Sequence, residues 1–279
     1  MRAKAVHSMT EGPLARSILA FSFPLMLSNV LQALFNMSDI AVVGRFAGAE
    51  ALGSVGSTAI LVTLFTGFLI GVGSGVNAVT ARFLGARQHK DVEETVHTAF
   101  LLCLIIGLVE MALGQIFARP LLELLHTKDE LIDGATLYLR IYFLGMIPQI
   151  LYNTGTYILR AIGDSKRPLY FLIAASLVNI VLDVVFIAVF GWGVMGAALA
   201  TVLSQVASAV LTLRCIVGSQ GMPWHIRAEK LRLHGDVFAA ICTIGVPAAA
   251  QSAMYNISNM FIQSSMNSFG TSTIAAWGV

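Results

Sequence analysis

The chain has 279 residues, 57% of them hydrophobic and 11% charged, with a mean hydropathy of +0.80 and a formal net charge of +2. This composition excludes an ordinary soluble domain and indicates a protein surrounded by membrane lipid. No nucleic-acid partner is expected. Cys103, Cys215 and Cys242 lie in or beside apolar segments, so we expect neither a disulfide framework nor a cysteine metal site.

Long uncharged runs predict helices that cross the membrane. A bilayer core of ~30 Å needs about 20 helical residues, whereas the strands of a membrane barrel are about ten residues long. The predicted spans are 14–43, 51–81, 93–118, 131–161, 168–190, 194–217 and 237–265, followed by the start of an eighth from about residue 272. The first span follows a basic N-terminus but is too long for a signal-peptide core, so we interpret it as retained. We therefore expect an all-α integral membrane protein.

Lysine and arginine fall unevenly on the two sides of these spans. Thirteen lie on the side of the N-terminus, whereas the opposite side has only Arg45, Arg119 and Lys128. Basic residues concentrate on the cytoplasmic side of membrane proteins. The sequence therefore predicts a multi-pass protein of the plasma (cytoplasmic) membrane with a cytoplasmic N-terminus.

A weak internal repeat suggests a two-lobe organisation. FPLMLSNVLQALFNMSDIAVVGRFAGAEALGSVG, from Phe23, is echoed by VPAAAQSAMYNISNMFIQSSMNSFGTSTIAAWGV, from Val246, with Pro24 matching Pro247. The seventh span then repeats the first, and six spans per repeat make the two copies parallel. We expect a cytoplasmic N-terminus (1–13), an N-lobe of six transmembrane helices (14–218), a cytoplasmic linker (219–236) and the start of a C-lobe (237–279). The rest of the C-lobe would then be a missing partner, present only in a full-length chain.

Three acids lie clearly inside predicted spans: Asp39, Glu110 and Asp183. An acid at the centre of a membrane helix costs roughly 2.5–3.5 kcal/mol on insertion scales. Counting residues from the span ends places Asp39, Asp183 and Thr201 at a similar depth in the outer half of the bilayer. Asn179 lies one turn deeper than Asp183 on the same helix face. These four residues form the predicted binding site for a cation or a proton.

The chemistry of this set suits both ligands. Two facing carboxylates in a low-dielectric cavity cannot both stay ionised cheaply, so the pair Asp39–Asp183 favours the uptake of a proton. The oxygens of two acids, an amide and a hydroxyl also suit a hard metal cation such as Na⁺. The alternative is that each polar side chain only satisfies a neighbouring helix.

Glu110 and Arg140 are nearly equidistant from the turn around Leu125. An antiparallel hairpin of the third and fourth spans would bring them to one depth. We expect a structural ion pair, with substrate gating as the alternative.

Two further patterns concern helix shape. Pro24 and Pro148 lie inside the first and fourth spans, where prolines should kink the helices, and we expect Pro24 to act as a hinge. Gly67, Gly71 and Gly75 recur every four residues in GFLIGVGSG, which resembles a phosphate loop but has no preceding strand and no following GK[ST]. Close helix packing through a face of small residues explains these glycines better.

Four segments resemble the multidrug and toxic compound extrusion (MATE) family, most closely its prokaryotic NorM/DinF-like members. They are FPLMLSNVLQALFNMSDIAVVGRFAG in the first span, YNTGTYILRAIGDSKRP at 152–168, LVNIVLDVVFI in the fifth span and GVMGAALATVLSQ at 193–205. The resemblance implies a twelve-helix, two-lobe transporter, of which this chain holds the N-lobe, helix 7 and the beginning of helix 8.

The resemblance also implies a function. Family members are secondary active antiporters that export organic cations and drugs in exchange for H⁺ or Na⁺; they are not enzymes and need no cofactor besides the coupling ion. The family's N-lobe cation site falls on Asp39, Asn179, Asp183 and Thr201, while Phe35 stands where some members have a tyrosine.

Two other functions compete with antiport. One is a flippase or exporter of lipid-linked or polysaccharide substrates with a related architecture, which a cavity rich in Arg and Lys would favour. The other is an intramembrane aspartyl protease, for which Asp39 and Asp183 would form the dyad. However, Asp39 lacks the Tyr-Asp context that such enzymes usually have.

Overall fold

A computed structural model describes residues 14–267. The described residues form helices and no strand, which confirms the all-α expectation. The α-helices are α1 (Leu14–Val42), α2 (Gly48–Gly85), α3 (His89–Leu124), α4 (Asp129–Leu144), α5 (Met146–Ala161), α6 (Lys166–Asp183), α7 (Gly193–Val217) and α8 (Gly235–Asn267). Two π-helical segments, η1 (Val43–Ala47) and η2 (Val184–Val189), and a short 3-10 turn, η3 (Ala228–Lys230), complete them. The expected N-terminal segment 1–13 and the expected helix from about 272 lie outside the described residues.

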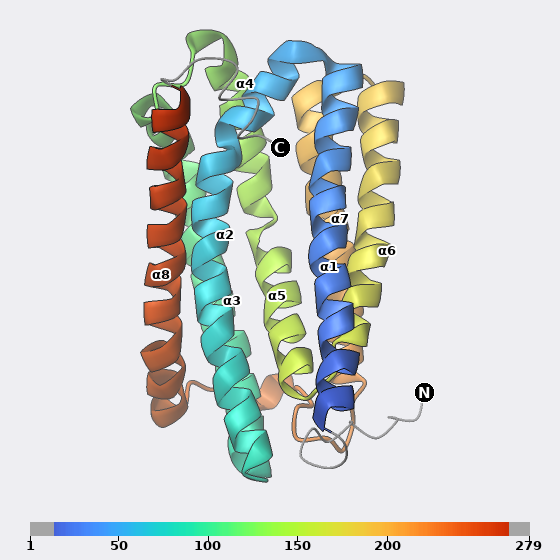
Figure 1. Ribbon diagram of the computed structural model, residues 1–279, viewed down its shortest axis with the longest axis vertical. Helices are drawn as coiled ribbons and strands as arrows, with labels where there is room; N and C mark the ends of the chain where they lie inside the picture. Colours follow the sequence, from blue (N-terminus) through green and yellow to red (C-terminus); the bar gives the residue numbers. More distant parts are fainter. Residues whose placement is uncertain (1–13, 268–279) are drawn as a thin grey trace.

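The helices run along the long axis of the molecule as a bundle (Figure 1). Within residues 14–267, five helical runs are long and apolar enough to cross a membrane. The first, Ser17–Gly85, has 69 residues and turns back at η1, so it crosses twice as α1 and α2. α4 and α5 have 16 residues each. Either helix alone is only ~24 Å long and needs the other to cross a core of ~30 Å.

The basic loops lie at one end of the bundle. The start of α1 and the α2–α3, α5–α6 and α7–α8 connections are at the lower end in Figure 1. We call this the basic end, since it carries Arg82, Lys90, Arg167 and Lys230 among others. The α1–α2, α3–α4 and α6–α7 connections are at the opposite end, which we call the outer end because the sequence predicts that it faces away from the cytoplasm. The uneven charge seen in the sequence is therefore an asymmetry of the folded bundle.

The surface of the bundle is apolar. Large hydrophobic side chains are exposed along α1, including Leu19 (70%), Phe23 (69%) and Met26 (67%). Such exposure would be costly in water, but lipid tails are as apolar as these side chains. The helices therefore cannot rely on hydrophobic burial alone and must pack through shape and hydrogen bonds.

The crossing of the membrane by α4 and α5 is interrupted at Gly145. Pro148 lies one turn later and has no N–H to donate to the carbonyl of Leu144, which is its i−4 partner in a regular helix. At the break, the Gly145 N–H donates to the carbonyl of Tyr142, three residues earlier, at 2.9 Å, whereas a regular α-helix would pair it with the residue four earlier. Proline chemistry thus accounts for the break.

The segment between α7 and α8 is tied to the N-terminal turns of α3. The His97 ring is 1% exposed; its Nε2 accepts a hydrogen bond from the Arg227 N–H at 3.0 Å, while its Nδ1 lies 2.7 Å from the Glu93 carbonyl oxygen. Lys230 Nζ lies 2.7 Å from a Glu93 carboxylate oxygen. These contacts fix where α8 begins.

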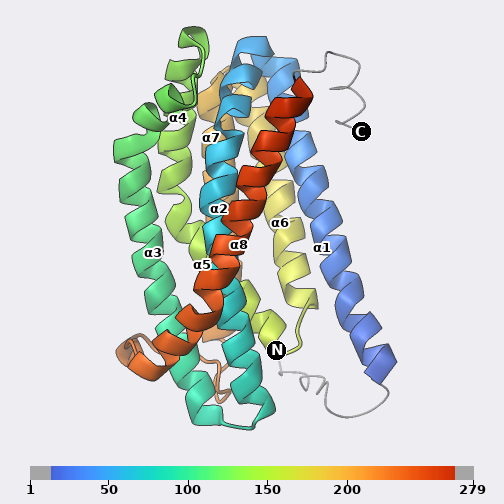
Figure 2. The ribbon, with the colours of Figure 1, turned by 60° about the vertical axis from the view of Figure 1, so that its left-hand side comes forward.

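α8 packs along α2, although the two helices are far apart in the sequence (Figures 1 and 2). The glycines of α2 make this approach close. A Cβ at Gly71 would overlap the backbone of Ala249, and one at Gly75 would lie 2.5 Å from the Ile241 carbonyl oxygen. The expected role of these glycines in helix packing is confirmed.

We predict that Gly71→Ala lowers the stability of the fold by about 1–3 kcal/mol, the usual cost of overpacking. The added methyl group must displace α8, because it meets backbone rather than a movable side chain. The midpoint of thermal unfolding in detergent measures the effect. Gly56→Ala on the same helix is the control, since no atom lies within 4 Å of the added Cβ. Equal midpoints for the two variants would contradict the prediction.

Candidate cation site and cavity

The four predicted site residues come from three neighbouring helices, with α6 between the other two. Asp39 lies on α1, Asn179 and Asp183 on α6, and Thr201 on α7. α6 packs against both α1 and α7. Asn179 and Asp183 are 0% exposed and Thr201 is 8% exposed, whereas Asp39 is half-buried.

The structure brings the two acids together. The Asp39 and Asp183 carboxyl groups are neighbours, close enough to interact directly with each other. Neither Asp183 oxygen, nor Oδ1 of Asp39, has a hydrogen-bond donor among the described residues. Two carboxylates cannot hydrogen-bond each other unless one carries a proton, and without it they repel each other. The pair therefore needs a shared proton or a cation.

Asn179 adds an amide to the same face of α6. Both its Oδ1 and its Nδ2 are buried without a partner among the described residues. Thr201 differs, because its hydroxyl donates to the Ala197 carbonyl at 3.0 Å on its own helix. The hydroxyl oxygen still has free lone pairs for a cation. Unsatisfied oxygens thus belong mainly to α1 and α6.

Each acid lies at or near a π-helical segment. Asp183 is the last residue before η2, and Asp39 lies one turn before η1. The two segments contact each other near the outer end of the bundle. π-Helical turns widen a helix and are frequent at functional sites. The sequence analysis did not predict these segments, which read VGRFA and VVFIAV and lie within or directly after the predicted spans.

Tyr138 is a neighbour that the sequence did not identify. It comes from α4, is 6% exposed, and lies close to Asp39, Asp183 and Thr201. A tyrosine in an apolar helix does not by itself indicate a functional site. The spacing of four residues between Tyr138 and Tyr142 indicates only that both lie on one face of the helix.

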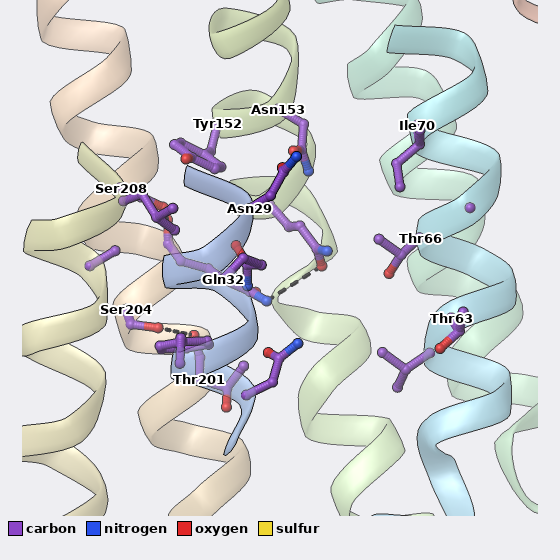
Figure 3. Close-up of a pocket in the computed structure, with 18 of the residues that line it drawn as sticks. Asn29, Gln32, Thr63, Thr66, Ile70, Tyr152, Asn153, Thr201, Ser204 and Ser208 are labelled. Carbon is purple, nitrogen blue, oxygen red and sulfur yellow. Dashed lines mark hydrogen bonds between the residues drawn. The ribbon is translucent and has the colours of Figure 1, made fainter. Parts of the chain in front are cut away.

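A cavity of about 950 Å³ opens beside the acid pair. Figure 3 shows its walls: Thr201, Ser204 and Ser208 of α7 face Thr63, Thr66 and Ile70 of α2, with Asn29 and Gln32 of α1 and Tyr152 and Asn153 of α5 between them. Asp39 lines the cavity, whereas Asp183 and Asn179 lie behind it, out of its lining. Most lining groups are neutral amides, hydroxyls and tyrosines.

The cavity has one acid and one base, at opposite ends. Asp39 lies toward the outer end and Arg160, at the end of α5, toward the basic end. Arg160 has a buried Nε without a hydrogen-bond partner among the described residues. The cavity thus combines apolar surface with many neutral polar groups and is charged only at its two ends.

The expected ion pair of Glu110 and Arg140 is wrong. Arg140 lies on the exposed face of α4 with Asp133, Leu137 and Leu144, and it takes part in none of the salt bridges of the described residues. Glu110 is 5% exposed and its Oε2 has no partner there. The Arg140 carbonyl accepts a hydrogen bond from Gln115 of α3 at 2.7 Å, but its side chain belongs to the exposed face of α4 and does not reach the buried Glu110.

Pro24 lies buried within α1, which continues through it without a break. The Ser28 hydroxyl donates to the Pro24 carbonyl at 2.8 Å. The proline removes one backbone donor from the helix, so this turn has fewer constraints than its neighbours. Its role as a hinge stays a prediction.

In residues 14–267 no group of three or more His, Cys, Asp or Glu side chains is placed to hold a metal ion. A site for Na⁺ at the acid pair would therefore depend on two carboxylates, with amide, hydroxyl or water oxygens completing the shell.

We predict that Na⁺ or acidification stabilises the protein through the acid pair. A ligand present at 100 times its Kd raises stability by about 2.7 kcal/mol. Asp39→Asn and Asp183→Asn should each remove most of this gain, and the double variant should remove no more, because both carboxyls hold one ligand. Thermal unfolding in detergent at varied Na⁺ and pH measures it. Asp133→Asn, on the exposed face of α4, is the control. Additive losses from the two single variants would contradict a shared ligand.

Comparison with known proteins places this geometry in a family. A family profile described as MatE matches residues 24–185. The probable multidrug resistance protein YoeA of Bacillus subtilis (strain 168) is 32% identical over 273 residues, which cover 95% of this chain and 58% of the relative. The FAD transporter of Shewanella oneidensis is 26% identical over 98% of this chain and 61% of its own length.

Solved structures agree with these relatives. An outward-facing multidrug resistance MATE family transporter of the MOP superfamily matches with a TM-score of 0.87 and 26% identity, covering 95% of this chain and 58% of its own. The chain thus spans about 60% of the length of its relatives. With a matching profile over more than half of its residues and a relative above 30% identity, this multi-pass membrane chain belongs to the MATE family of transporters.

Proposed function

We propose that this chain is the N-lobe, with helix 7 and the beginning of helix 8, of a secondary active antiporter. The antiporter exports organic cations and drugs in exchange for H⁺ or Na⁺ across the plasma membrane, and the basic end of the bundle faces the cytoplasm. Family membership favours transport over proteolysis, although the acids would also fit a protease dyad. The observation that carries the proposal is the pair of buried Asp183 and half-buried Asp39 beside a cavity lined by many polar groups.

Asp39, Asn179, Asp183 and Thr201 would bind the coupling ion. The pair is costly without a proton or a cation, so the ion is held strongly only while α1 and α6 stay packed together. If the substrate prefers an arrangement in which they separate, ion and substrate exclude each other. Antiport requires only that the two ligands prefer different conformations.

The cavity suits a drug-sized organic molecule. Pockets for such ligands are about 300–1,000 Å³ and combine apolar surface with a few polar groups. Asp39 gives a cationic substrate a counter-charge, while the amides and tyrosines accept varied partners. A flippase for lipid-linked or polysaccharide substrates is less well supported, because the cavity lining includes one arginine and no lysine.

Pro24 would serve as the hinge of α1. Asp39 lies about four turns beyond it on the same helix, so a small bend at Pro24 moves the carboxyl by a large distance. Proline kinks are a common means of bending membrane helices.

We predict that Asp39→Asn and Asp183→Asn reduce ion-driven efflux by about 5–150-fold, the range of a typical coupling free energy. Efflux of a fluorescent organic cation is measured in membrane vesicles that contain the complete gene product, with a pH gradient or a Na⁺ gradient imposed separately. The gradient that drives efflux identifies the ion. Glu123→Gln, an exposed acid near the outer end of α3, is the control. Unchanged efflux and coupling in both aspartate variants would refute the proposal.

A second prediction concerns the hinge. Pro24→Ala restores a backbone N–H and should favour a straight, fully hydrogen-bonded α1, which lowers the transport rate without loss of folded protein. Vesicle efflux and the elution profile in detergent measure the two effects. The matched change is Pro120→Ala, at an exposed position in α3. A hinge role is excluded if both alanine variants transport equally well.

A further inference from the structure

Glu110 is a buried acid that the proposed site does not use. It is 5% exposed, lies on α3 among the buried residues Gly107 and Gly114, and has an Oε2 without a hydrogen-bond partner among the described residues. An unpaired carboxylate in such surroundings is expensive. The carboxyl group is therefore expected to bind a positively charged ligand that neutralises it. The neighbouring residues of α3 show which helices it faces.

The two glycines show which part of the bundle Glu110 faces. A Cβ at Gly107 would lie 2.9 Å from Cγ2 of Ile150 and 3.8 Å from Cα of Ile147, both on α5. A Cβ at Gly114 would overlap the ring of Phe143 on α4. Glu110 lies between the two glycines on the same helix face. It thus faces the α4–α5 junction, which contains Gly145 and Pro148.

Pro148 leaves this junction with one backbone donor fewer, because it has no N–H for the Leu144 carbonyl. The described residues likewise supply no hydrogen-bond donor to Oε2 of Glu110. A protonated carboxyl can itself donate a hydrogen bond, whereas a carboxylate only accepts and needs donors. Burial without a donor at this oxygen therefore favours the protonated form of Glu110.

The titratable groups that face Glu110 do not neutralise it. They are Tyr142 on α4 and Cys103 on α3, which are both uncharged when protonated. On the helices that pack against α3, the other titratable groups lie toward the helix ends, on the exposed face or around the cavity: Glu50 and Arg82 on α2; Asp129, Glu130, Asp133, Tyr138 and Arg140 on α4; Tyr152, Tyr157 and Arg160 on α5; Asp236, Cys242 and Tyr255 on α8.

We propose that Glu110 is a second proton-binding carboxyl, separate from the pair Asp39–Asp183, and that it holds its proton while α3 is packed against the α4–α5 junction. Opening of the junction would admit water and release the proton. The ligand is H⁺ alone, since one carboxyl without further oxygen ligands does not make a site for a metal cation.

Tyr142 connects this carboxyl to the cavity. Its side chain is 5% exposed, neighbours Glu110 on one side, and lies near Thr66, Gln149 and Gln205 on the other. All three of those residues line the cavity. Only the Tyr142 side chain therefore separates Glu110 from polar groups of the cavity wall, so a change of charge at Glu110 would alter the electrostatic potential there.

Infrared spectroscopy of the complete gene product in lipid at neutral pH tests the proposal. Exposed glutamates are ionised there, so a protonated glutamic acid gives a distinct carbonyl band. We expect such a band in the unsubstituted protein, moved by incorporation of ¹³C-carboxyl glutamate. Glu110→Gln should abolish it, and Glu110→Asp should make it insensitive to the label. Glu123→Gln should leave it in place.

The experiment separates this site from the proposed transport site. In the double variant Asp39→Asn/Asp183→Asn the glutamate band should persist, even though efflux is lost. Absence of any label-sensitive band in the unsubstituted protein overturns the proposal, and this holds whether or not Glu110→Gln folds. A band that survives in Glu110→Gln or Glu110→Asp with its label sensitivity also overturns it.

Discussion

The packing of the helices around the cavity depends on two neighbouring carboxyl groups inside an apolar bundle. Asp183 is completely buried and its oxygens have no donor among the described residues, while Asp39 lies opposite on α1. Each would cost several kcal/mol as an unpaired ion in hydrocarbon. In the proposed antiporter, a bound positive charge, whether a proton or a metal cation, would therefore stabilise the contact between α1 and α6. Binding of that ion would then be coupled to the packing of the two helices.

Irregular segments interrupt the helices that carry or neighbour the acid pair. η1 and η2 follow the two acids and contact each other, and the break at Gly145 divides the crossing by α4 and α5. Regular helices resist bending because every backbone bond must be kept in lipid. A π-helical turn or a proline break gives up some of those bonds locally. Elsewhere the close contact of α2 with α8 through glycines keeps one wall rigid.

Counting residues from the span ends predicted the depth of polar side chains in the membrane well, but it did not predict toward which neighbouring helix they point. It placed Asp39, Asp183 and Thr201 at one level, and the structure shows the two acids facing each other. The same counting paired Glu110 with Arg140, yet Arg140 belongs to the exposed stripe of α4. In water an apolar stripe shows which way a helix faces. In lipid both faces are apolar, so this signal is weak, and Tyr138 went unidentified for the same reason. Pro148 did mark the break near Gly145, because proline acts on the local backbone.

In the proposed antiporter, the positions of the polar residues would explain how ion and substrate compete. Asp39 lines the cavity, whereas Asp183 and Asn179 lie behind it without reaching the lining. A cationic substrate can therefore approach Asp39 but not Asp183. When Asp39 is shared with Asp183 through a proton or a metal ion, its charge is already neutralised and attracts the substrate less. When that ion leaves, the two acids repel each other and Asp39 becomes the counter-charge of the cavity. One residue that belongs to both sites is enough to make the two ligands exclude each other.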